Sequence, residues 1–217
     1  MRKTLLTICV FFLVTMWACA GMCQSEWQAA PTQIEIVASG TTGTLTVYSN
    51  SNGKRTELLR TDAYVGRNGC STEKREGDGK TPVGVYEIRR GFGLSTPPAV
   101  SIAYTTLTGN EQWVDDVASA RYNQWVTTDV TPKDWNSAEN LSKEVVAYKY
   151  AAVVEYNTAN IVKGAGSAIF LHCSQDKPTS GCISVPEEAM IKILGFMKPG
   201  TRIAIARTDA ELDQMVK

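Results

Sequence analysis

Short runs of alternating apolar and polar residues recur from residue 34 to residue 206, and turn-forming residues separate them. Successive side chains of a β-strand point to opposite faces of a sheet, so a period of two predicts strands that are buried on one side. Strands are predicted over Ile34–Val37, Leu45–Tyr48, Leu58–Val65, Val83–Arg89, Val100–Tyr104, Val145–Tyr156, Ala168–Leu171 and Thr201–Ala206. The pattern therefore indicates a mainly β domain.

One longer helix is predicted near the carboxyl end. Pro186 suits a first helical position, Glu187 and Glu188 are favoured by the helix dipole there, and Pro199-Gly200 ends the segment. The spacing i, i+3, i+4 and i+7 gives this helix one apolar face, made by Met190, Ile193, Leu194 and Met197. Strands thus outnumber helices.

The amino terminus is typical of a secretory signal peptide. Two basic residues precede the apolar stretch Leu5–Trp17, and Ala18-Cys19-Ala20 supplies a small-residue cleavage site. The apolar stretch is too short to span a bilayer comfortably. We therefore expect export to the periplasm or cell envelope, with an uncleaved membrane anchor as one alternative and acylation of Cys19 or Cys23 as another.

The remaining chain divides at changes in composition. The predicted parts are a signal peptide at 1–20, a small and polar tether at 21–33, a catalytic domain at 34–207 and a helical tail at 208–217. Thr208 and Glu211 have the spacing of a capping box for that tail. Residues 108–143 hold several aromatic residues among polar ones and are expected to form an irregular excursion from the core.

The overall charge gives no reason to expect a nucleic-acid partner. Lys and Arg total 22, Asp and Glu total 22, and the formal net charge is zero. A nucleic-acid or anionic-membrane surface would need an excess of basic residues. Membrane contact is accordingly expected only through an N-terminal anchor, if the leader is not cleaved.

The chain has a single histidine, and its position points to chemistry. His172 ends an apolar strand, and Cys182 follows ten residues later, just before the predicted helix. A cysteine nucleophile needs a base or a lowered pKa, which a nearby imidazole can provide. Gly181 allows a tight turn, so that amides near Cys182 could face a developing oxyanion. A core histidine and a structural Ser-Gly-Cys turn are the alternatives.

Chain order and spacing narrow the kinds of site. Papain-like proteases place the cysteine before the histidine, and no histidine follows Cys182. A zinc site is disfavoured because adjacent strand residues diverge and no paired ligand spacing is present. By the same alternation, Cys173 should point away from His172; it then either pairs with Cys70 in a disulfide or both remain free thiols.

Two sequence blocks resemble L,D-transpeptidase catalytic domains, also called YkuD-like domains. His172 followed by Thr179-Ser-Gly-Cys-Ile183 is similar to the family's histidine and Gly-Cys signature, and Glu76-Gly-Asp-Gly-Lys-Thr-Pro-Val-Gly-Val-Tyr86 is similar to its upstream glycine-rich element. Tyr156-Asn157 resembles a third, weaker element. The resemblance implies a curved mixed β-sheet or sandwich with a few short helices.

The resemblance also implies an activity on peptidoglycan stem peptides, without a cofactor or metal. Cys182 would be the nucleophile, His172 the proton acceptor and donor, and the amides of Gly181 and Cys182 the oxyanion hole. An amine would resolve the thioester in a transpeptidase, and water in an L,D-carboxypeptidase. A non-catalytic cell-wall-binding module is the alternative from another class.

Departures from the family pattern affect substrate binding. Ser180 stands where the family often has histidine or arginine, and Ser184 where it often has arginine or asparagine. Arg67 or Lys80 could supply the missing positive charge to a stem carboxylate, with a solvated surface role as the alternative. The residues expected to bind substrate are Arg67, Tyr156, Thr179, Ser180 and Ser184.

Overall fold

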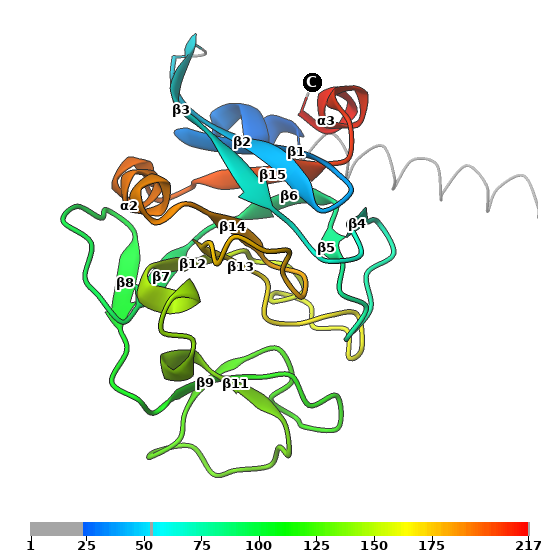
Figure 1. The fold of residues 1–217 in the computed structure, drawn as a ribbon, viewed down its shortest axis with the longest axis vertical. Coiled ribbons are helices and arrows are strands. Elements are labelled where there is room, and N and C mark those ends of the chain that lie inside the picture. Colours follow the sequence, from blue (N-terminus) through cyan, green and yellow to red (C-terminus); the bar gives the residue numbers. More distant parts are fainter. Residues whose placement is uncertain (1–23, 53, 217) are drawn as a thin grey trace, which may run out of the picture.

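The computed structural model describes residues 24–52 and 54–216, and it has a ten-stranded mixed sheet as its main feature (Figure 1). The strand order is β6-β15-β1-β2-β3-β14-β13-β12-β7-β8. In that order the strands are Gly84–Glu87, Arg202–Ala206, Thr32–Ser39, Thr42–Ser51, Lys54–Tyr64, Ile183–Val185, Phe170–Cys173, Ala151–Val153, Arg90–Gly93 and Ala103–Thr106. The prediction of a mainly β fold with a curved mixed sheet is confirmed.

This sheet contains both parallel and antiparallel pairs. Strands β1 and β15, β13 and β14, and β7 and β8 pair in parallel, whereas β1, β2 and β3 form an antiparallel meander. Parallel neighbours need long connections. The connection between β13 and β14 is the segment 174–182, which carries the Ser-Gly-Cys turn.

Helix α2, Glu187–Phe196, confirms the helix predicted from sequence. Its buried residues Met190, Ile193 and Leu194 pack with Leu171 and Ile183 in the main hydrophobic cluster. Burying each such side chain contributes about 1.5–3 kcal/mol. The helix therefore covers one face of β13 and β14 and leaves the other face for the site.

A second, smaller sheet lies below the main one in Figure 1. Its strands are β10, Trp125–Thr127, β9, Glu111–Val114, and β11, Ala138–Asn140. This sheet gives regular structure to part of the segment expected to be irregular. The 3-10 helices η1, Leu141–Lys143, and η2, Ala147–Lys149, return the chain to the main sheet.

The predicted strand over Val145–Tyr156 is only partly correct. Residues 147–149 form η2, and only Ala151–Val153 form β12. The buried Tyr148 packs edge-on to Phe170 with ring centroids 5.5 Å apart. This aromatic contact is made from a helical turn, and a period of two cannot distinguish that turn from an extended strand.

The predicted tether at 21–33 differs from the structure in its described part. Residues 24–29 are helical, and β1 begins at Thr32. Trp27 is only 1% exposed and packs with Leu212 and Val216 of helix α3, Asp209–Val216. A buried tryptophan of this size joins residues 24–33 to the domain. The signal-peptide prediction and Cys19 and Cys23 lie outside the described residues.

The three described cysteines are unpaired, so of the two alternatives for Cys70 and Cys173 the structure has the free thiols and not the disulfide. Cys70 lies near Glu211 and Arg207, beside α3, on the two-residue strand β4, Cys70–Ser71, which pairs with β5, Thr81–Pro82. Cys173 donates instead to the carbonyl of Tyr150 at 3.5 Å. The two thiols therefore have different surroundings. The prediction that Cys173 points away from His172 is confirmed, because Cys173 belongs to the cluster beneath α2.

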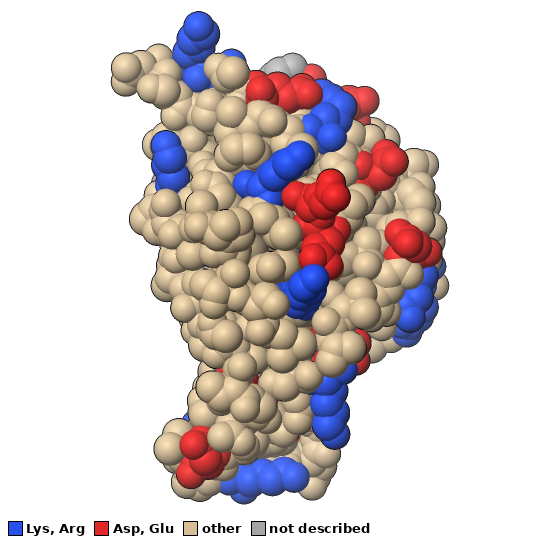
Figure 2. Space-filling view, turned by 60° about the vertical axis from the view of Figure 1, so that its left-hand side comes forward, with Lys and Arg blue, Asp and Glu red and all other residues tan. Residues whose placement is uncertain are grey.

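Lys and Arg side chains alternate with Asp and Glu on the face of the molecule that Figure 2 shows. On the surface of the protein, opposite charges also meet in exposed or half-buried pairs such as Lys149 with Glu187 and Arg89 with Glu87. Such pairs contribute at most about 1 kcal/mol each. This interspersed pattern agrees with the formal net charge of zero.

Candidate active site

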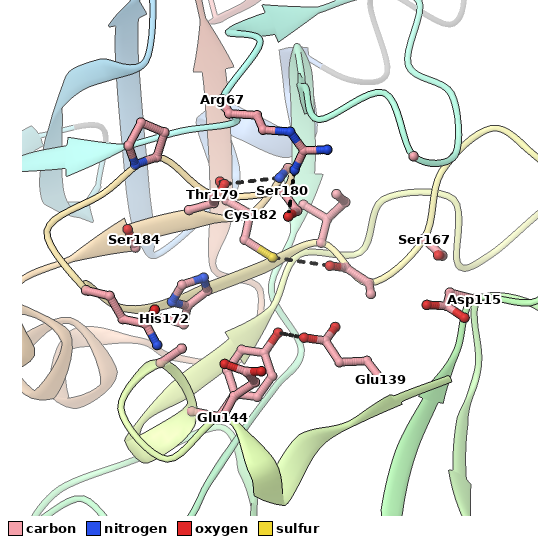
Figure 3. Close-up of a pocket in the computed structure, with 18 of the residues that line it drawn as sticks. Arg67, Asp115, Glu139, Glu144, Ser167, His172, Thr179, Ser180, Cys182 and Ser184 are labelled. Carbon is pink, nitrogen blue, oxygen red and sulfur yellow. Dashed lines mark hydrogen bonds between the residues drawn. The ribbon is translucent and has the colours of Figure 1, made fainter. Parts of the chain in front are cut away.

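A cavity of about 470 Å³ opens on the face of β13 and β14 opposite α2 (Figure 3). His172 and Ser184 are register partners on these two strands, and Cys182 immediately precedes β14. All three line the cavity. The sequence prediction that the only histidine and Cys182 come together is confirmed at the level of a shared cavity.

His172 is held by its neighbours in a defined state. Its Nδ1 lies 2.8 Å from the carbonyl oxygen of Cys173, and its ring packs edge-on to Tyr148 with centroids 5.5 Å apart. A carbonyl only accepts, so Nδ1 carries the proton and Nε2 has the free lone pair. Burial lowers the pKa of His172 to about 4, opposed by the hydrogen bond to Cys173. At neutral pH the ring is a neutral base.

The thiol of Cys182 is also neutral in this structure. Its Sγ donates to the carbonyl of Ala168 at 3.2 Å and accepts from the amide of Phe170 at 3.3 Å. Burial raises the pKa of Cys182 to about 12, and the nearby Glu139 carboxylate adds to this shift. Forming the thiolate therefore requires a base close by and a change in the thiol's hydrogen bond.

Ala168 has a backbone conformation that is uncommon for its residue type. Its φ is +53°, in the left-handed region that L-residues with a Cβ rarely adopt. Its amide donates to Oδ1 of Asn123 at 3.1 Å, which helps to hold this conformation. Such strained residues concentrate at functional sites. Here the strain aims the Ala168 carbonyl at the Cys182 thiol, a role that no sequence motif signalled.

The turn before Cys182 requires glycine. Gly181 has φ +148°, and a Cβ there would lie 2.9 Å from the carbonyl oxygen of Lys80. Thr179 Oγ1 accepts from the Gly181 amide at 3.1 Å and donates to the Cys182 carbonyl at 2.7 Å. The Thr179 side chain thus organises the turn, and the Gly181 amide of the predicted oxyanion hole is engaged with it.

The glycine-rich element 76–86 braces this turn from the other side. Thr81 Oγ1 donates to the Cys182 carbonyl at 3.2 Å and accepts from the Gly66 amide at 2.8 Å. Asp78 accepts from Lys74 Nζ and from the amide of Lys80, each at 2.8 Å. The Gly-Asp-Gly motif therefore shapes the loop that places Lys74 in the cavity wall.

Arg67 lines the same cavity as Cys182 and His172. Its Nη1 donates to Oγ of Ser180 at 2.9 Å, and both residues line the cavity. The Arg67 amide donates to the Thr179 carbonyl at 2.8 Å, which fixes the base of the side chain. Ser180 and Ser184 carry no positive charge, and Arg67, which lies in the connection between β3 and β4, brings one to the cavity. Lys80 is not among the residues that line the cavity.

Of the two remaining residues expected to bind substrate, Ser184 lines the cavity and Tyr156 does not. Ser184 is 1% exposed, and its Oγ has no hydrogen-bond partner among the described residues, although it lines the cavity. Tyr156 is outside the cavity lining, so its predicted place in the site is wrong. Its hydroxyl donates to the Ala165 carbonyl at 2.6 Å, and its ring packs edge-on to Tyr86. Tyr156 supports a loop.

The wall opposite Arg67 is acidic, and no sequence motif predicted it. Asp115, Glu139 and Glu144 line the cavity from the small sheet and the turns that follow it (Figure 3). Glu139 accepts a hydrogen bond from the buried hydroxyl of Tyr148. Burial raises the pKa of Glu139 to about 7, with Glu144 and Asp115 adding to the shift and Tyr148 opposing it. The cavity therefore has one cationic and one anionic wall.

Neither a metal site nor a membrane-spanning helix is found in the described part of the chain. Among residues 24–52 and 54–216, no three His, Cys, Asp or Glu side chains are grouped so as to hold a metal ion. Within the same ranges, every helix is too short or too polar to cross a bilayer.

A comparison with protein families shows to which family the chain belongs. The family model of the L,D-transpeptidase catalytic domain (YkuD) matches residues 33–205. The chain belongs to this family. The match includes both Cys182 and His172, and it covers the main sheet except for the first residue of β1 and the last residue of β15. The family resemblance inferred from the two sequence blocks is confirmed.

Solved structures show more distant similarity to this L,D-transpeptidase family member. Bd1075 of Bdellovibrio bacteriovorus is 16% identical with a TM-score of 0.44, over 86% of this chain and 53% of that one. L,D-transpeptidase 1 of Mycobacterium tuberculosis is 16% identical with a TM-score of 0.34, over 81% of this chain and 62% of that one. The chain thus spans less than two thirds of either protein. A search of curated proteins finds no match.

Proposed function

We propose that this protein is an exported peptidoglycan L,D-transpeptidase that forms cross-links through a Cys182 thioester. The observation that carries the proposal is the shared cavity of Cys182 and a neutral His172, whose Nδ1 is bound to the Cys173 carbonyl. Because Nδ1 carries the proton in that bond, Nε2 has the free lone pair and is the nitrogen that can act as the base. The family relationship supports stem peptides as substrates.

In the first half-reaction, Nε2 of His172 accepts the thiol proton as Sγ of Cys182 attacks the carbonyl carbon at the L-centre of a tetrapeptide stem. For this the thiol exchanges its bond to Ala168 for one to His172. The bond to terminal D-alanine breaks, and the imidazolium protonates the leaving amine. The Cys182 amide stabilises the oxyanion, and the Gly181 amide joins it on leaving Thr179.

The two walls of the cavity provide binding groups for a charged stem. Arg67 is placed to hold a stem carboxylate, because a guanidinium offers two parallel donors to a carboxylate. The hydroxyl of Ser184 is buried without a partner, so a substrate group can satisfy it without displacing a protein contact. Ser180 orients Arg67 through its hydrogen bond.

Purified protein incubated with disaccharide-tetrapeptide tests this function by mass spectrometry of the products. Wild-type protein is expected to release D-alanine and form a cross-linked dimer, whereas Cys182→Ala does neither. Cys173→Ala is the matched control, since its thiol lies on the opposite face of β13. D-alanine release without dimer would assign the L,D-carboxypeptidase activity instead, and turnover by Cys182→Ala would refute the mechanism.

We also propose that residues 1–20 direct export and are then removed. The basic start, the apolar stretch and the Ala18-Cys19-Ala20 sequence support this proposal. Intact-mass measurement of the protein recovered from the cell envelope is expected to give the chain beginning at Gly21. A full-length mass would indicate an uncleaved anchor, and an added acyl mass at Cys19 or Cys23 would indicate a lipoprotein.

A further inference from the structure

The Glu139 and Tyr148 pair lies in the active site without a task in the first half-reaction. Glu139 projects from the middle of β11 into the cavity, and it accepts the hydroxyl hydrogen bond of Tyr148. The Tyr148 ring in turn packs edge-on to His172 at 5.5 Å. Glu139 is also close enough to Cys182 to affect the charge state of its thiol. One contact chain thus links Glu139, Tyr148 and His172.

The second half-reaction requires more proton transfers than His172 can supply alone. A primary amine enters as an ammonium ion at neutral pH and cannot attack a carbonyl until it has lost one proton. It loses a second proton when the amide forms. His172 must deliver a proton to the departing thiolate, so it can take only one of the two.

The groups around Glu139 favour binding of a cation from which the carboxylate can remove a proton. The charged and titratable groups that face Glu139 are Tyr148 from η2, Glu144 after η1, Asp115 after β9, and Cys182. None of these is cationic. Lys74, the cation in the cavity lining that acts on Cys182, is paired with Asp78 at 2.8 Å, so a positive ligand would meet neutral or negative groups beside Glu139. Asp115 Oδ1 is buried with no hydrogen-bond partner among the described residues, which leaves it able to accept from such a ligand.

We infer that Glu139, held by Tyr148, binds the ammonium group of the acceptor stem and removes its first proton before the amine attacks the Cys182 thioester. The inference rests on the proposed thioester mechanism and names the acceptor as a protonated primary amine. Glu139 would contact the reacting amine itself and so counts as a catalytic residue, with Tyr148 as a positioning residue.

The step is balanced in protons and bonds. The Glu139 carboxylate accepts one proton from the ammonium, and the resulting amine nitrogen attacks the thioester carbon. The new C–N bond forms, His172 Nε2 accepts the second proton, and the C–S bond breaks. The imidazolium then returns that proton to the thiolate, which restores the Cys182 thiol, and protonated Glu139 releases its proton to solvent.

The test compares two nucleophiles in resolving the acyl-enzyme of wild type and Glu139→Gln, made from disaccharide-tetrapeptide. One nucleophile is D-methionine, whose amine is protonated at pH 7, and the other is hydroxylamine, which is mostly neutral at that pH. Glu139→Gln should slow resolution by D-methionine by about 10²-fold, the usual effect of removing a general base. Resolution by hydroxylamine should stay within about threefold of wild type, because it does not need this base. Formation of the acyl-enzyme should not slow, because the variant removes a negative charge that raises the pKa of the Cys182 thiol.

Glu144→Gln is the matched control, since Glu144 lines the same wall but is exposed. Three results would overturn the inference. Glu139→Gln could slow resolution by both nucleophiles equally, Glu144→Gln could slow resolution by D-methionine as much as Glu139→Gln does, or Glu139→Gln could leave the reaction with D-methionine unchanged. A wild-type protein that forms no acyl-enzyme would refute the proposed function itself, a result that the acylation measurement reports separately.

Tyr148→Phe adds a readout that a purely structural role would not change. Phenylalanine keeps the ring against His172 but removes the hydrogen bond that lowers the pKa of Glu139. The pH midpoint for resolution by D-methionine should therefore move to higher pH in this variant. An unchanged midpoint would show that Glu139 is not the group that titrates.

Discussion

Cys182 and His172 are both uncharged at rest, which distinguishes this pair from a preformed thiolate–imidazolium pair. Burial opposes charge on each group, and the thiol is bound to Ala168 rather than activated. The cost of charge separation is therefore met only when a substrate carbonyl is in place to receive the sulfur. A neutral, hydrogen-bonded thiol also reacts slowly with alkylating and oxidising reagents, because these react with the thiolate.

The depressed pKa of His172 predicts the acid limit of acylation. A neutral imidazole is needed as the base, and with a pKa of about 4 it stays neutral well below its ordinary range. The single-turnover rate of D-alanine release should be flat from about pH 7 to about pH 5 and fall near pH 4. Quenched-flow measurement across this range checks the prediction, and a fall centred near pH 6.5 would contradict it.

At the scale of elements, the alternation along β13 separates structural from chemical residues. Leu171 and Cys173 face α2, whereas Phe170 and His172 face the cavity side. The turn that follows is anchored by hydroxyls, because Thr81 and Thr179 both donate to the carbonyl of Cys182. The position of the nucleophile therefore depends on a loop more than one hundred residues from it in sequence.

Thr81→Val tests this brace. Valine fits the fully buried site but leaves the Gly66 amide without its partner and removes one donor to Cys182. The free energy of unfolding should fall by about 1–3 kcal/mol, the usual effect of an unsatisfied buried group, and acylation should slow. Urea unfolding measures the change. Thr105→Val on exposed β8 is the control, and equal stability of both variants would count against the brace.

The sequence was informative where a pattern has a physical period or a chemical requirement. Alternation located the long strands and the orientation of His172 and Cys173, and helix signals located α2. Tyr156 was misplaced because a short motif does not say which way a side chain points after a strand ends. Glu139 was missed because it lies in the segment 108–143, which was expected to be irregular. Tyr148 and Ala168 were missed because both were assigned to strands, whereas Tyr148 lies in a helical turn and Ala168 has a left-handed backbone conformation.

At the scale of the whole molecule, the cavity lies between two differently built parts. The main sheet and its glycine-rich loop supply Cys182, His172 and the cationic wall, while the small sheet and its turns supply the acidic wall. Trp27 and α3 pack together against β15 and β1 of the main sheet, so the described amino-terminal residues belong to the folded unit. A ligand in the cavity therefore meets opposite charges from two parts of the fold.

The buried Glu139 carboxylate should reduce the stability of the whole protein at neutral pH. Its pKa is raised from 4.5 to about 7, so stability is fully present below about pH 4.5 and is lost as pH rises through 7. Glu139→Gln avoids this ionisation. Relative to wild type, its free energy of unfolding should rise between pH 5 and pH 8 by on the order of 2 kcal/mol.

Urea unfolding of both proteins at the two pH values gives this difference, in which contributions of the other titrating groups cancel. The exposed Glu144→Gln variant should show a smaller pH-dependent gain, because it removes only one minor contribution to the raised pKa of Glu139. A Glu139→Gln difference that is the same at pH 5 and pH 8 would show that this carboxylate titrates normally.

The most direct test of the central claim is to trap the acyl-enzyme and locate it. Wild-type protein is mixed with disaccharide-tetrapeptide at pH 5, where the amine acceptor is fully protonated, then acid-quenched, digested and sequenced by mass spectrometry. The mechanism predicts one adduct, of the stem without its terminal D-alanine, on the peptide that contains Cys182, and none in His172→Gln at the same time point. An adduct on Cys70 or Cys173, or release of D-alanine with no adduct on Cys182, would contradict it.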